Sequence, residues 1–277
     1  MRPIGSLSEV ASGYDAVVLD QWGVLHDGSA PYPRAAAAMT ALARVTRIAV
    51  LSNSGKRSAV NRARIRDIGL PDLAEVVMTS GEALWRDLSE GRSSIGRPYP
   101  VADTQENAVA WAEGLPLTFA ATPDEADAIL VMGLSETGVE EARAAIAAGV
   151  QKGLPILCSN PDRGSPRAGG RVALSPGALA GEAEERGAAV TWYGKPYRPV
   201  FDATRRALGL PEDARLLMVG DSPAHDIAGG QGAGWDTVLI AGGLHQGRLR
   251  GGDIAAVAAL CAEEGAPEPD YVLETLS

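Results

Sequence analysis

Three aspartates of this chain stand just after apolar runs that are typical of buried strands. Asp20 ends the run at 16–19, and Asp221 leaves the run at 216–219 with Asp226 on the next turn. Because open α/β sheets carry their chemistry at the carboxyl ends of their strands, we expect these carboxylates to lie at one edge of a sheet. An ionised group near a core is costly without a partner. Carboxylate oxygens, with waters and a substrate phosphate, are the ligands that Mg²⁺ prefers, so the pattern predicts a Mg²⁺ site.

Two further stretches carry groups that suit a bound phosphate. Ser52 and Asn53 end the apolar run at 48–51 and offer a hydroxyl and an amide, although capping of the following helix by a serine is an alternative. Lys195 lies between a predicted strand and a predicted helix, next to Pro196, and could reach a phosphate there as a point charge.

Together these groups suit phosphoryl transfer. A metal would let Asp20 stay ionised beside Asp221. The ionised Asp20 could then attack phosphorus and form an aspartyl phosphate. Lys195, Ser52 and the metal would neutralise the charge on the phosphoryl oxygens.

Short apolar runs alternate with helical patterns along nearly the whole sequence. The predicted strands are 16–19, 48–51, 76–79, 128–132, 156–158, 189–192, 216–219 and 237–240. The predicted helices are 33–45, 59–68, 81–88, 106–113, 138–150, 177–186, 198–208 and 254–264. This alternation predicts βαβ units, and hence an α/β protein with a Rossmann-like core of mostly parallel strands.

Two breaks with small or flexible residues divide the pattern. Ser80-Gly81 follows a predicted strand, Arg186-Gly187 ends a predicted helix, and the segment between them has strands and helices of its own. We therefore expect a core formed by 1–80 and 188–277, with a smaller α/β cap domain inserted at 81–187. Inside this segment, 160–170 has the composition of a loop.

Composition and charge narrow the class of protein. The 277 residues, 45% of them hydrophobic, suffice for one large domain or two ordinary ones. A formal charge of −10 argues against nucleic acid or an anionic membrane as the main partner, but leaves a small anionic substrate open. Cys158 and Cys261 form no CxxC pair, and no apolar run reaches the length of a membrane span. We expect a soluble, cytoplasmic protein with free thiols, and leave a homo-oligomer open.

The order of these groups resembles the haloacid dehalogenase-like (HAD) hydrolase superfamily. It is most similar to class IIA, which has a large α/β cap and includes p-nitrophenyl phosphatase-like, phosphoglycolate and nucleotide phosphatases. The resemblance covers nearly the whole chain, in DQWGVLHDG, LSNSGKRS, TSGEAL, NPDR, PGALA, GKPYRPVFDA and GDSPAHDIAGGQGAGWDTVLIAGG. It implies a Mg²⁺-dependent phosphohydrolase that acts on a small phosphorylated metabolite, such as a sugar phosphate or nucleotide, through an aspartyl phosphate.

Carried over residue by residue, the resemblance makes Asp20 the nucleophile and a metal ligand. Lys195 becomes the charge-neutralising base. Asp221 becomes a metal ligand, Asp226 a direct or water-mediated one, and the backbone carbonyl of Trp22 a further ligand.

The resemblance also implies residues that bind the substrate. Ser52 and Asn53 would contact the phosphate. In the cap, the predicted loop offers Asn160, Asp162, Arg163 and Arg167 as candidates for contacts with the rest of the substrate.

One position departs from the family's pattern. The family usually has a second aspartate two residues after the nucleophile, as general acid and then base, and here Trp22 stands there. Extended backbone would point the side chains of Asp20 and Trp22 the same way, so we expect the indole where the acid normally lies. Losing a general acid typically costs ~10²–10⁴-fold in rate. His26 or Asp27 could supply the proton, or the substrate could have a good leaving group. The indole could also stack on a sugar or base, or exclude water.

Two other functions stay open. A haloacid dehalogenase would also use an aspartate nucleophile but needs no metal, so Asp221 and Asp226 count against it. A catalytically weak or inactive protein that binds a phosphometabolite would explain why Trp22 replaces the acid.

Overall fold

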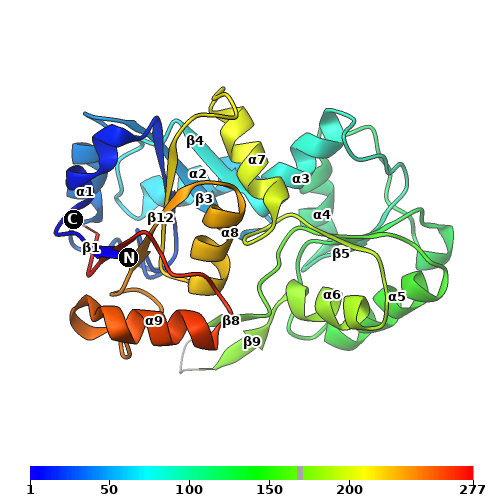
Figure 1. Ribbon diagram of the computed structural model, residues 1–277. Helices are drawn as coiled ribbons and strands as arrows, with labels where there is room; N and C mark the ends of the chain where they lie inside the picture. The colour runs from blue at the N-terminus through cyan, green and yellow to red at the C-terminus, as the bar shows by residue number, and fades with distance from the viewer. Residues whose placement is uncertain (167–170, 277) are drawn as a thin grey trace. The chain divides into compact units, whose positions relative to one another are not determined.

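The computed structural model describes residues 1–166 and 171–276, and the chain folds into two compact α/β units. The larger unit comprises Met1–Ser52, Ser58–Met78 and Lys195–Ser277. The smaller unit comprises Asn53–Arg57 and Thr79–Gly194. Helices alternate with strands in both (Figure 1), which confirms the α/β fold class expected from the sequence pattern.

The larger unit is built on a seven-stranded sheet in the order β1-β13-β12-β11-β2-β3-β4. Its strands are β1 (Arg2–Pro3), β2 (Ala16–Asp20), β3 (Arg47–Ser52), β4 (Val76–Thr79), β11 (Leu216–Gly220), β12 (Asp236–Ile240) and β13 (Tyr271–Leu273). The pairs from β1 to β3 are all parallel. All five residues of β2 are buried, because this apolar strand pairs on both edges within a covered sheet.

Helices cover both faces of this sheet. They are α1 (Ala35–Leu42), α2 (Ser58–Asp67), α7 (Arg198–Ala207), α8 (Ala228–Gly232) and α9 (Ile254–Glu263). Val238 and Ile240 of β12 pack in one core with Met39 of α1, whereas Leu239 packs in a second core with Leu260 of α9. The alternation follows from the two-residue period of a strand.

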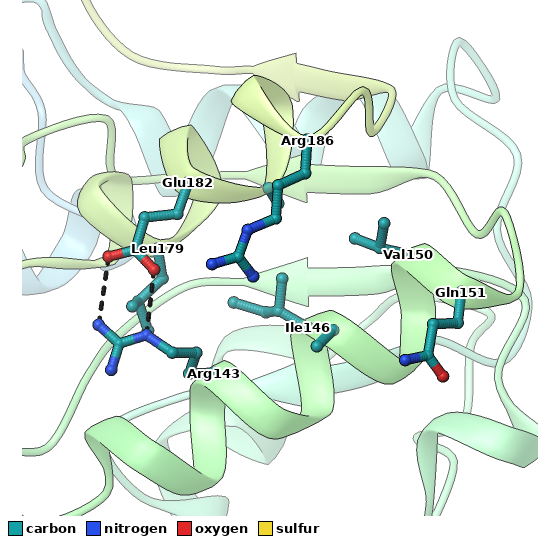
Figure 2. Close-up of a pocket in the computed structure, with 9 residues that line it drawn as sticks. Arg143, Ile146, Val150, Gln151, Leu179, Glu182 and Arg186 are labelled. Atoms are coloured by element: carbon teal, nitrogen blue, oxygen red, sulfur yellow. Dashed lines mark hydrogen bonds and ion pairs between the residues drawn. The ribbon is translucent and has the colours of Figure 1, made fainter.

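The smaller unit has a four-stranded parallel sheet in the order β10-β7-β6-β5. Its strands are β5 (Tyr99–Val101), β6 (Ile129–Val131), β7 (Ile156–Cys158) and β10 (Val190–Trp192), and its helices are α3 (Ser80–Ser89), α4 (Gln105–Ala112), α5 (Val139–Gln151) and α6 (Pro176–Glu185). Helices α5 and α6 border a groove that contains Ile146 and Leu179, with an ion pair between Arg143 and Glu182 at one end (Figure 2).

Every predicted strand and helix is present, but three of the expectations need correction, two on the division of the chain and one on a predicted loop. Strand β10 pairs with β7 of the smaller sheet, so the division falls after Gly194 and not at 187/188. An apolar run does not reveal which sheet it will join. Residues 53–57, assigned to the core from the sequence, also belong to the smaller unit.

The third correction concerns the predicted loop at 160–170. It contains β8 (Gly164–Pro166), which pairs antiparallel with β9 (Val172–Leu174). Its Arg167 lies outside the described residues. Cys158 and Cys261 are buried free thiols. Among the residues described, none of the helices has the length and apolar character needed to cross a membrane.

Candidate active site

Asp20, Ser52 and Asp221 stand at the ends of three neighbouring parallel strands. Strand β2 pairs with β3, where Asp20 lies opposite Leu51, and with β11, where Leu19 lies opposite Val219. Ser52 is the last residue of β3, and Asp221 follows β11 directly. The register therefore brings the three residues to one edge of the larger sheet, as the sequence pattern predicts for parallel strands.

Lys195 lies between two of the aspartates. Its Nζ donates a hydrogen bond to Asp20 Oδ1 at 2.5 Å and another to Asp226 Oδ1 at 2.6 Å, and all three side chains are buried. Burial disfavours the ammonium, but the charges and hydrogen bonds of Asp20 and Asp226 outweigh it and raise the pKa of Lys195 above its usual value. Lys195 is therefore a cation at neutral pH.

The pKa of Asp20 is raised, chiefly by burial and further by the charges of Asp226 and Asp221, although Lys195 acts to lower it. The positive charge of Lys195 is therefore too small to cancel the effect of burial and of the neighbouring carboxylates on the pKa of Asp20. A second cation at this place would favour the ionised form of Asp20 that a nucleophile needs.

Asp226 is held on both of its carboxylate oxygens. While Oδ1 accepts from Lys195, Oδ2 accepts from the backbone N–H groups of Asp221 at 3.2 Å and Ser222 at 3.0 Å. Ser222 also caps the helical turn Pro223–Ile227 on which Asp226 lies, since its Oγ accepts from the N–H of His225. This turn explains why an aspartate beyond the strand end still reaches the cluster.

Asp221 has a different environment. Its Oδ2 accepts from the backbone N–H of Leu244 at 2.7 Å. Burial and the neighbouring charge of Asp226 raise the pKa of Asp221 to about 7. Asp221 therefore holds a proton easily unless a cation replaces that proton.

Two glycines that the sequence analysis did not single out make room for Asp221. A Cβ atom on Gly23 would lie 1.8 Å from Asp221 Oδ2, and one on Gly243 would lie 2.3 Å from the same oxygen. Gly23 also has φ +88°, a conformation that other residues rarely adopt. The sequence feature that could have revealed them is a glycine within a few residues of the end of a buried strand, Gly23 after β2 and Gly243 after β12.

The donor set fits a hard divalent cation. Asp20, Asp221 and Asp226 each offer one oxygen, and these oxygens lie within 4.8 Å of one another. When all three carboxylates are ionised, they and Lys195 carry two net negative charges in a buried place, which a divalent ion would neutralise. The contact of Gly23 with Asp221 also places the Trp22–Gly23 backbone at the cluster.

The side chain of Trp22 is held at its polar edge. Its Nε1–H donates to the carbonyl oxygen of Asp27 at 3.1 Å, and the residue is 40% exposed. Trp22 thus occupies the position of the usual acid without offering an ionisable group.

Neither substitute acid suggested by the sequence is suited to donate a proton at neutral pH. His26 is buried and its Nδ1 accepts from the N–H of Gly28, while burial and the charge of Arg64 lower its pKa. Hydrogen bonds from the backbone of Ala30 and Ser29 lower the pKa of Asp27. We therefore infer a neutral His26 and an ionised Asp27.

In the smaller unit, Asn53 and Asn160 both contact Asp162. Asn53 Nδ2 donates to Asp162 Oδ1 at 2.8 Å, and Asn160 Oδ1 accepts from the N–H of Asp162 at 3.2 Å. Arg163 lies instead against α6, where its exposed guanidinium is 3.8 Å from Glu185. The substrate contacts expected of Asn53, Asn160 and Arg163 stay predictions.

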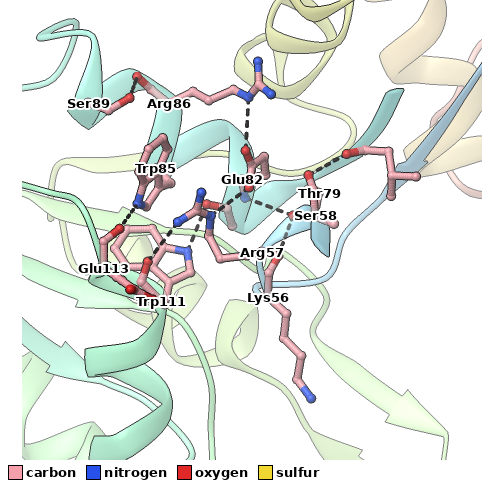
Figure 3. Close-up of polar contacts among 12 residues, drawn as sticks. Lys56, Arg57, Ser58, Thr79, Glu82, Trp85, Arg86, Ser89, Trp111 and Glu113 are labelled. Carbon is pink, nitrogen blue, oxygen red and sulfur yellow. Dashed lines mark hydrogen bonds and ion pairs between the residues drawn. The ribbon is translucent and has the colours of Figure 1, made fainter. Parts of the chain in front are cut away.

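Polar contacts hold the segment Asn53–Arg57 against α3 and the residue before it in the smaller unit (Figure 3). Arg57 Nε pairs with Glu82 at 2.7 Å, and its guanidinium lies 3.8 Å from the ring centroid of Trp85. Thr79 Oγ1 donates to the carbonyl oxygen of Lys56. No local sequence pattern predicts this attachment, because Arg57 resembles any basic residue near the start of a helix.

Fold and site together define an α/β protein with a buried acidic centre suited to a cation. A family model described as haloacid dehalogenase-like hydrolase matches residues 14–234, and a second, described as HAD-hydrolase-like, matches residues 192–277. The first match spans most of the chain, so this protein belongs to the haloacid dehalogenase-like hydrolase family.

Similar solved structures include other hydrolases of this kind. A haloacid dehalogenase-like family hydrolase from Brucella suis 1330 is 26% identical, with a TM-score of 0.79 over 99% of this chain and 100% of that one. A p-nitrophenyl phosphatase from Archaeoglobus fulgidus is 22% identical, with a TM-score of 0.76 over 95% of this chain and 96% of that one. A glycerol phosphate phosphatase from Mycobacterium tuberculosis, in complex with calcium, is 22% identical, with a TM-score of 0.71 over 85% of this chain and 68% of that one.

These likenesses agree with the expected class IIA fold, although those at 22% identity show the fold alone. A cardiolipin synthase/mitochondrial hydrolase fusion protein of Schizosaccharomyces pombe is 34% identical over 65 residues. That match spans 21% of this chain and 11% of the fusion protein, so a short segment of this chain corresponds to a small part of that protein.

Proposed function

We propose that this protein is a Mg²⁺-dependent phosphohydrolase that acts on a small phosphorylated metabolite through an aspartyl phosphate on Asp20. The observation that carries the proposal is the buried ion pair between Asp20 and Lys195 beside Asp221 and Asp226. Phosphatases among the similar folds support the same reaction class.

Asp20 is the nucleophile. Because its Oδ1 accepts from Lys195, Oδ2 is the oxygen that forms the bond to phosphorus. As that bond forms, the bond from phosphorus to the leaving oxygen breaks, and its electron pair stays on the leaving oxygen. Water then attacks phosphorus and loses a proton to the solvent. The bond to Asp20 breaks, which yields phosphate and the free carboxylate.

Lys195 and Ser52 assist without forming bonds to phosphorus. Lys195 holds Asp20 in orientation, and its charge offsets the negative charge that gathers on the phosphoryl oxygens. Ser52, at the end of the neighbouring strand, would contact those oxygens, and its position at the same sheet edge as Asp20 supports this role. Both groups act through position and charge, which suits phosphoryl transfer.

Asp20, Asp221 and the carbonyl of Trp22 would hold Mg²⁺. When bound, the ion would supply positive charge at the phosphoryl group. Both oxygens of Asp226 already accept hydrogen bonds, so we assign this residue a contact through water. Calcium in a similar fold is consistent with an oxygen-rich site for a hard cation.

The proposal is tested by hydrolysis of acetyl phosphate and p-nitrophenyl phosphate, with Mg²⁺ or with EDTA, using Asp20→Asn as the control. We expect activity to require both the metal and Asp20. During turnover of acetyl phosphate, mass spectrometry should detect a phosphoryl group on the wild type and none on the variant. Activity that survives EDTA and the substitution would exclude this mechanism.

A second candidate is a protein that binds a phosphometabolite and hardly turns it over. Trp22 in the place of the usual acid favours it, since neither His26 nor Asp27 is suited to replace that acid. A broad panel of phosphoesters separates the two candidates. Binding detected by calorimetry without turnover of any ester or acyl phosphate would favour the second.

A further inference from the structure

Helices α5 and α6 of the smaller unit border a cavity of about 150 Å³ (Figure 2). Its lining is largely apolar: Ile146 and Leu179 are buried, and Ala147 and Val150 are half-buried. Ile146 and Leu179 also belong to the core around β6 and β7, so packing holds them in place. An apolar cavity of this volume holds a molecule of the size of benzene, which has about six carbon atoms.

Arg186, the residue that caps the C-terminal end of α6, projects over this cavity. Figure 2 shows its guanidinium above Ile146, between the two helices. Among the residues that the structure describes, none forms an ion pair or a side-chain hydrogen bond with this guanidinium. The acids in the second half of α6 have other partners: Glu182 pairs with Arg143, Glu184 accepts from Trp192, and Glu185 pairs with Arg163.

The charge of the cavity lies at Arg186. The charged side chains of the lining are two guanidinium groups and one carboxylate, which leaves one net positive charge. Arg143 donates two hydrogen bonds to Glu182, at 3.0 and 3.2 Å, so these two charges compensate each other. The chain as a whole carries a formal charge of −10, so a net positive lining is not a general property of its surface.

This charge and the apolar lining together define the chemistry of a ligand. A guanidinium matches the two oxygens of a carboxylate, and one negative charge balances the one net positive charge. A phosphate ester with two negative charges would leave one of them against apolar side chains, which is costly. A pocket with an apolar body and few polar groups at one place suits a ligand built in the same way.

We propose that the cavity binds an aliphatic monocarboxylate of about six carbon atoms. Its carboxylate pairs with Arg186 and its hydrocarbon chain lies on Ile146 and Leu179. The site lies within the smaller unit and uses none of the residues assigned to the reaction, so it does not depend on the proposed function.

The first test titrates the wild type with hexanoate, acetate, 1-hexanol and hexylamine, and follows the methyl NMR signals of Ile146 and Leu179. We expect hexanoate to shift both signals and to bind more than about tenfold tighter than acetate, since each buried methylene alone contributes roughly a factor of four. Hexanoate should also bind more tightly than 1-hexanol, which lacks the charge, and hexylamine should bind most weakly of the three six-carbon compounds.

The second test uses variants and calorimetry. Arg186→Gln should weaken hexanoate about tenfold or more and leave 1-hexanol unchanged, since a hydrogen bond to a charged group has at least this effect. Ala147→Leu adds apolar atoms to the lining and should weaken both compounds. Arg163→Gln is the matched control, because it removes an exposed arginine that pairs with the neighbouring Glu185, and it should leave both affinities unchanged.

Thermal unfolding shows which variants are folded, and the titrations of the wild type decide the proposal if a variant is not. Equal affinities for hexanoate and 1-hexanol, equal losses in Arg186→Gln and Arg163→Gln, or no shift at Ile146 and Leu179 would overturn it. Sedimentation velocity covers the remaining occupant. A dimer that Ala147→Leu dissociates, without binding of hexanoate, would assign the groove to a second copy of the chain and overturn the proposal.

Discussion

Asp20 and Lys195, which are 175 positions apart in the sequence, form a buried ion pair with 2.5 Å between Oδ1 and Nζ. The pair joins the end of β2 to the segment before α7. Because both groups are withdrawn from water, each depends on the other, and removal of one leaves an uncompensated buried charge.

Lys195→Met should therefore abolish phosphatase activity and destabilise the protein. Breaking a buried pair typically costs about 3–5 kcal/mol in the free energy of unfolding. Urea denaturation of the metal-free protein measures this loss of stability. Lys152→Met is the control, since the side chain of Lys152 is partly exposed. The loss should be smaller in an Asp20→Asn background, and a loss in wild type no greater than that of the control would contradict the ion pair's role.

Asp221 should make the effect of Mg²⁺ depend on pH. Its pKa is raised from 3.8 to about 7, so the folded state holds an extra proton between these values, and the metal-free protein loses stability as pH rises through this window. Mg²⁺ must displace the proton, so it should raise Tm more at about pH 8 than at about pH 5.5. Thermal unfolding with Mg²⁺ or EDTA tests this. A shift that does not change with pH, or one kept in full by Asp221→Asn, would argue against it.

Gly23→Ala should damage the cation site. The new Cβ would lie 1.8 Å from Asp221 Oδ2. Gly69→Ala is a matched control, because Gly69 has φ +89° against +88° for Gly23 but no atom within 4 Å of a Cβ. Both variants bear the backbone cost of about 1 kcal/mol, and only Gly23→Ala should also weaken Mg²⁺ binding in calorimetry. Equal metal affinities would show that the contact with Asp221 is unimportant.

Asp226→Asn should mainly lower the stability of the metal-free protein, whereas Asp221→Asn should mainly weaken the binding of Mg²⁺. Both oxygens of Asp226 accept hydrogen bonds, so an amide there turns its NH₂ toward either Lys195 or backbone N–H groups, at a cost of about 1–3 kcal/mol in stability. Asp221→Asn removes a like charge from the cluster and should cost the metal-free protein little, while weakening Mg²⁺ binding strongly. Denaturation in EDTA and Mg²⁺ titration of both variants measure the contrast. The reverse order in either experiment would refute it.

Turnover should depend steeply on the acidity of the leaving group. With Trp22 in place of the acid, kcat/KM should rise from glycerol phosphate through p-nitrophenyl phosphate to acetyl phosphate. Trp22→Asp should improve glycerol phosphate most, by up to ~10²-fold if the new carboxylate is held in place. His26→Gln should show no selective loss on glycerol phosphate, because His26 is neutral. Similar chemical-step rates on alkyl and acyl phosphates, or such a selective loss, would mean that another group supplies the proton.

Local sequence pattern predicted most of the strands of the two sheets and most of the helices that cover them. Apolar runs such as the one in β2 and helical periods such as the one in α5 are local properties, so they predict elements without knowledge of their neighbours. The strands that were missed are short. β1 has two residues and β5, β8, β9 and β13 have three each, and, apart from the β8–β9 pair, their backbone pairing comes from strands far away in the chain. For the same reason, only the structure placed β10 in the smaller sheet.

The sequence also predicted that Asp20, Ser52 and Asp221 meet, because parallel strands end at one edge of their sheet. Directions of side chains in loops could not be derived this way. Only the tertiary structure paired Lys195 with Asp20 and turned Arg163 toward Glu185, since such contacts depend on residues far away in the chain. Likewise, the hydrogen bond from Trp22 to Asp27 determines how the indole is oriented. Because Trp22 lies beyond the end of β2, the alternation of side chains along a strand cannot predict this orientation.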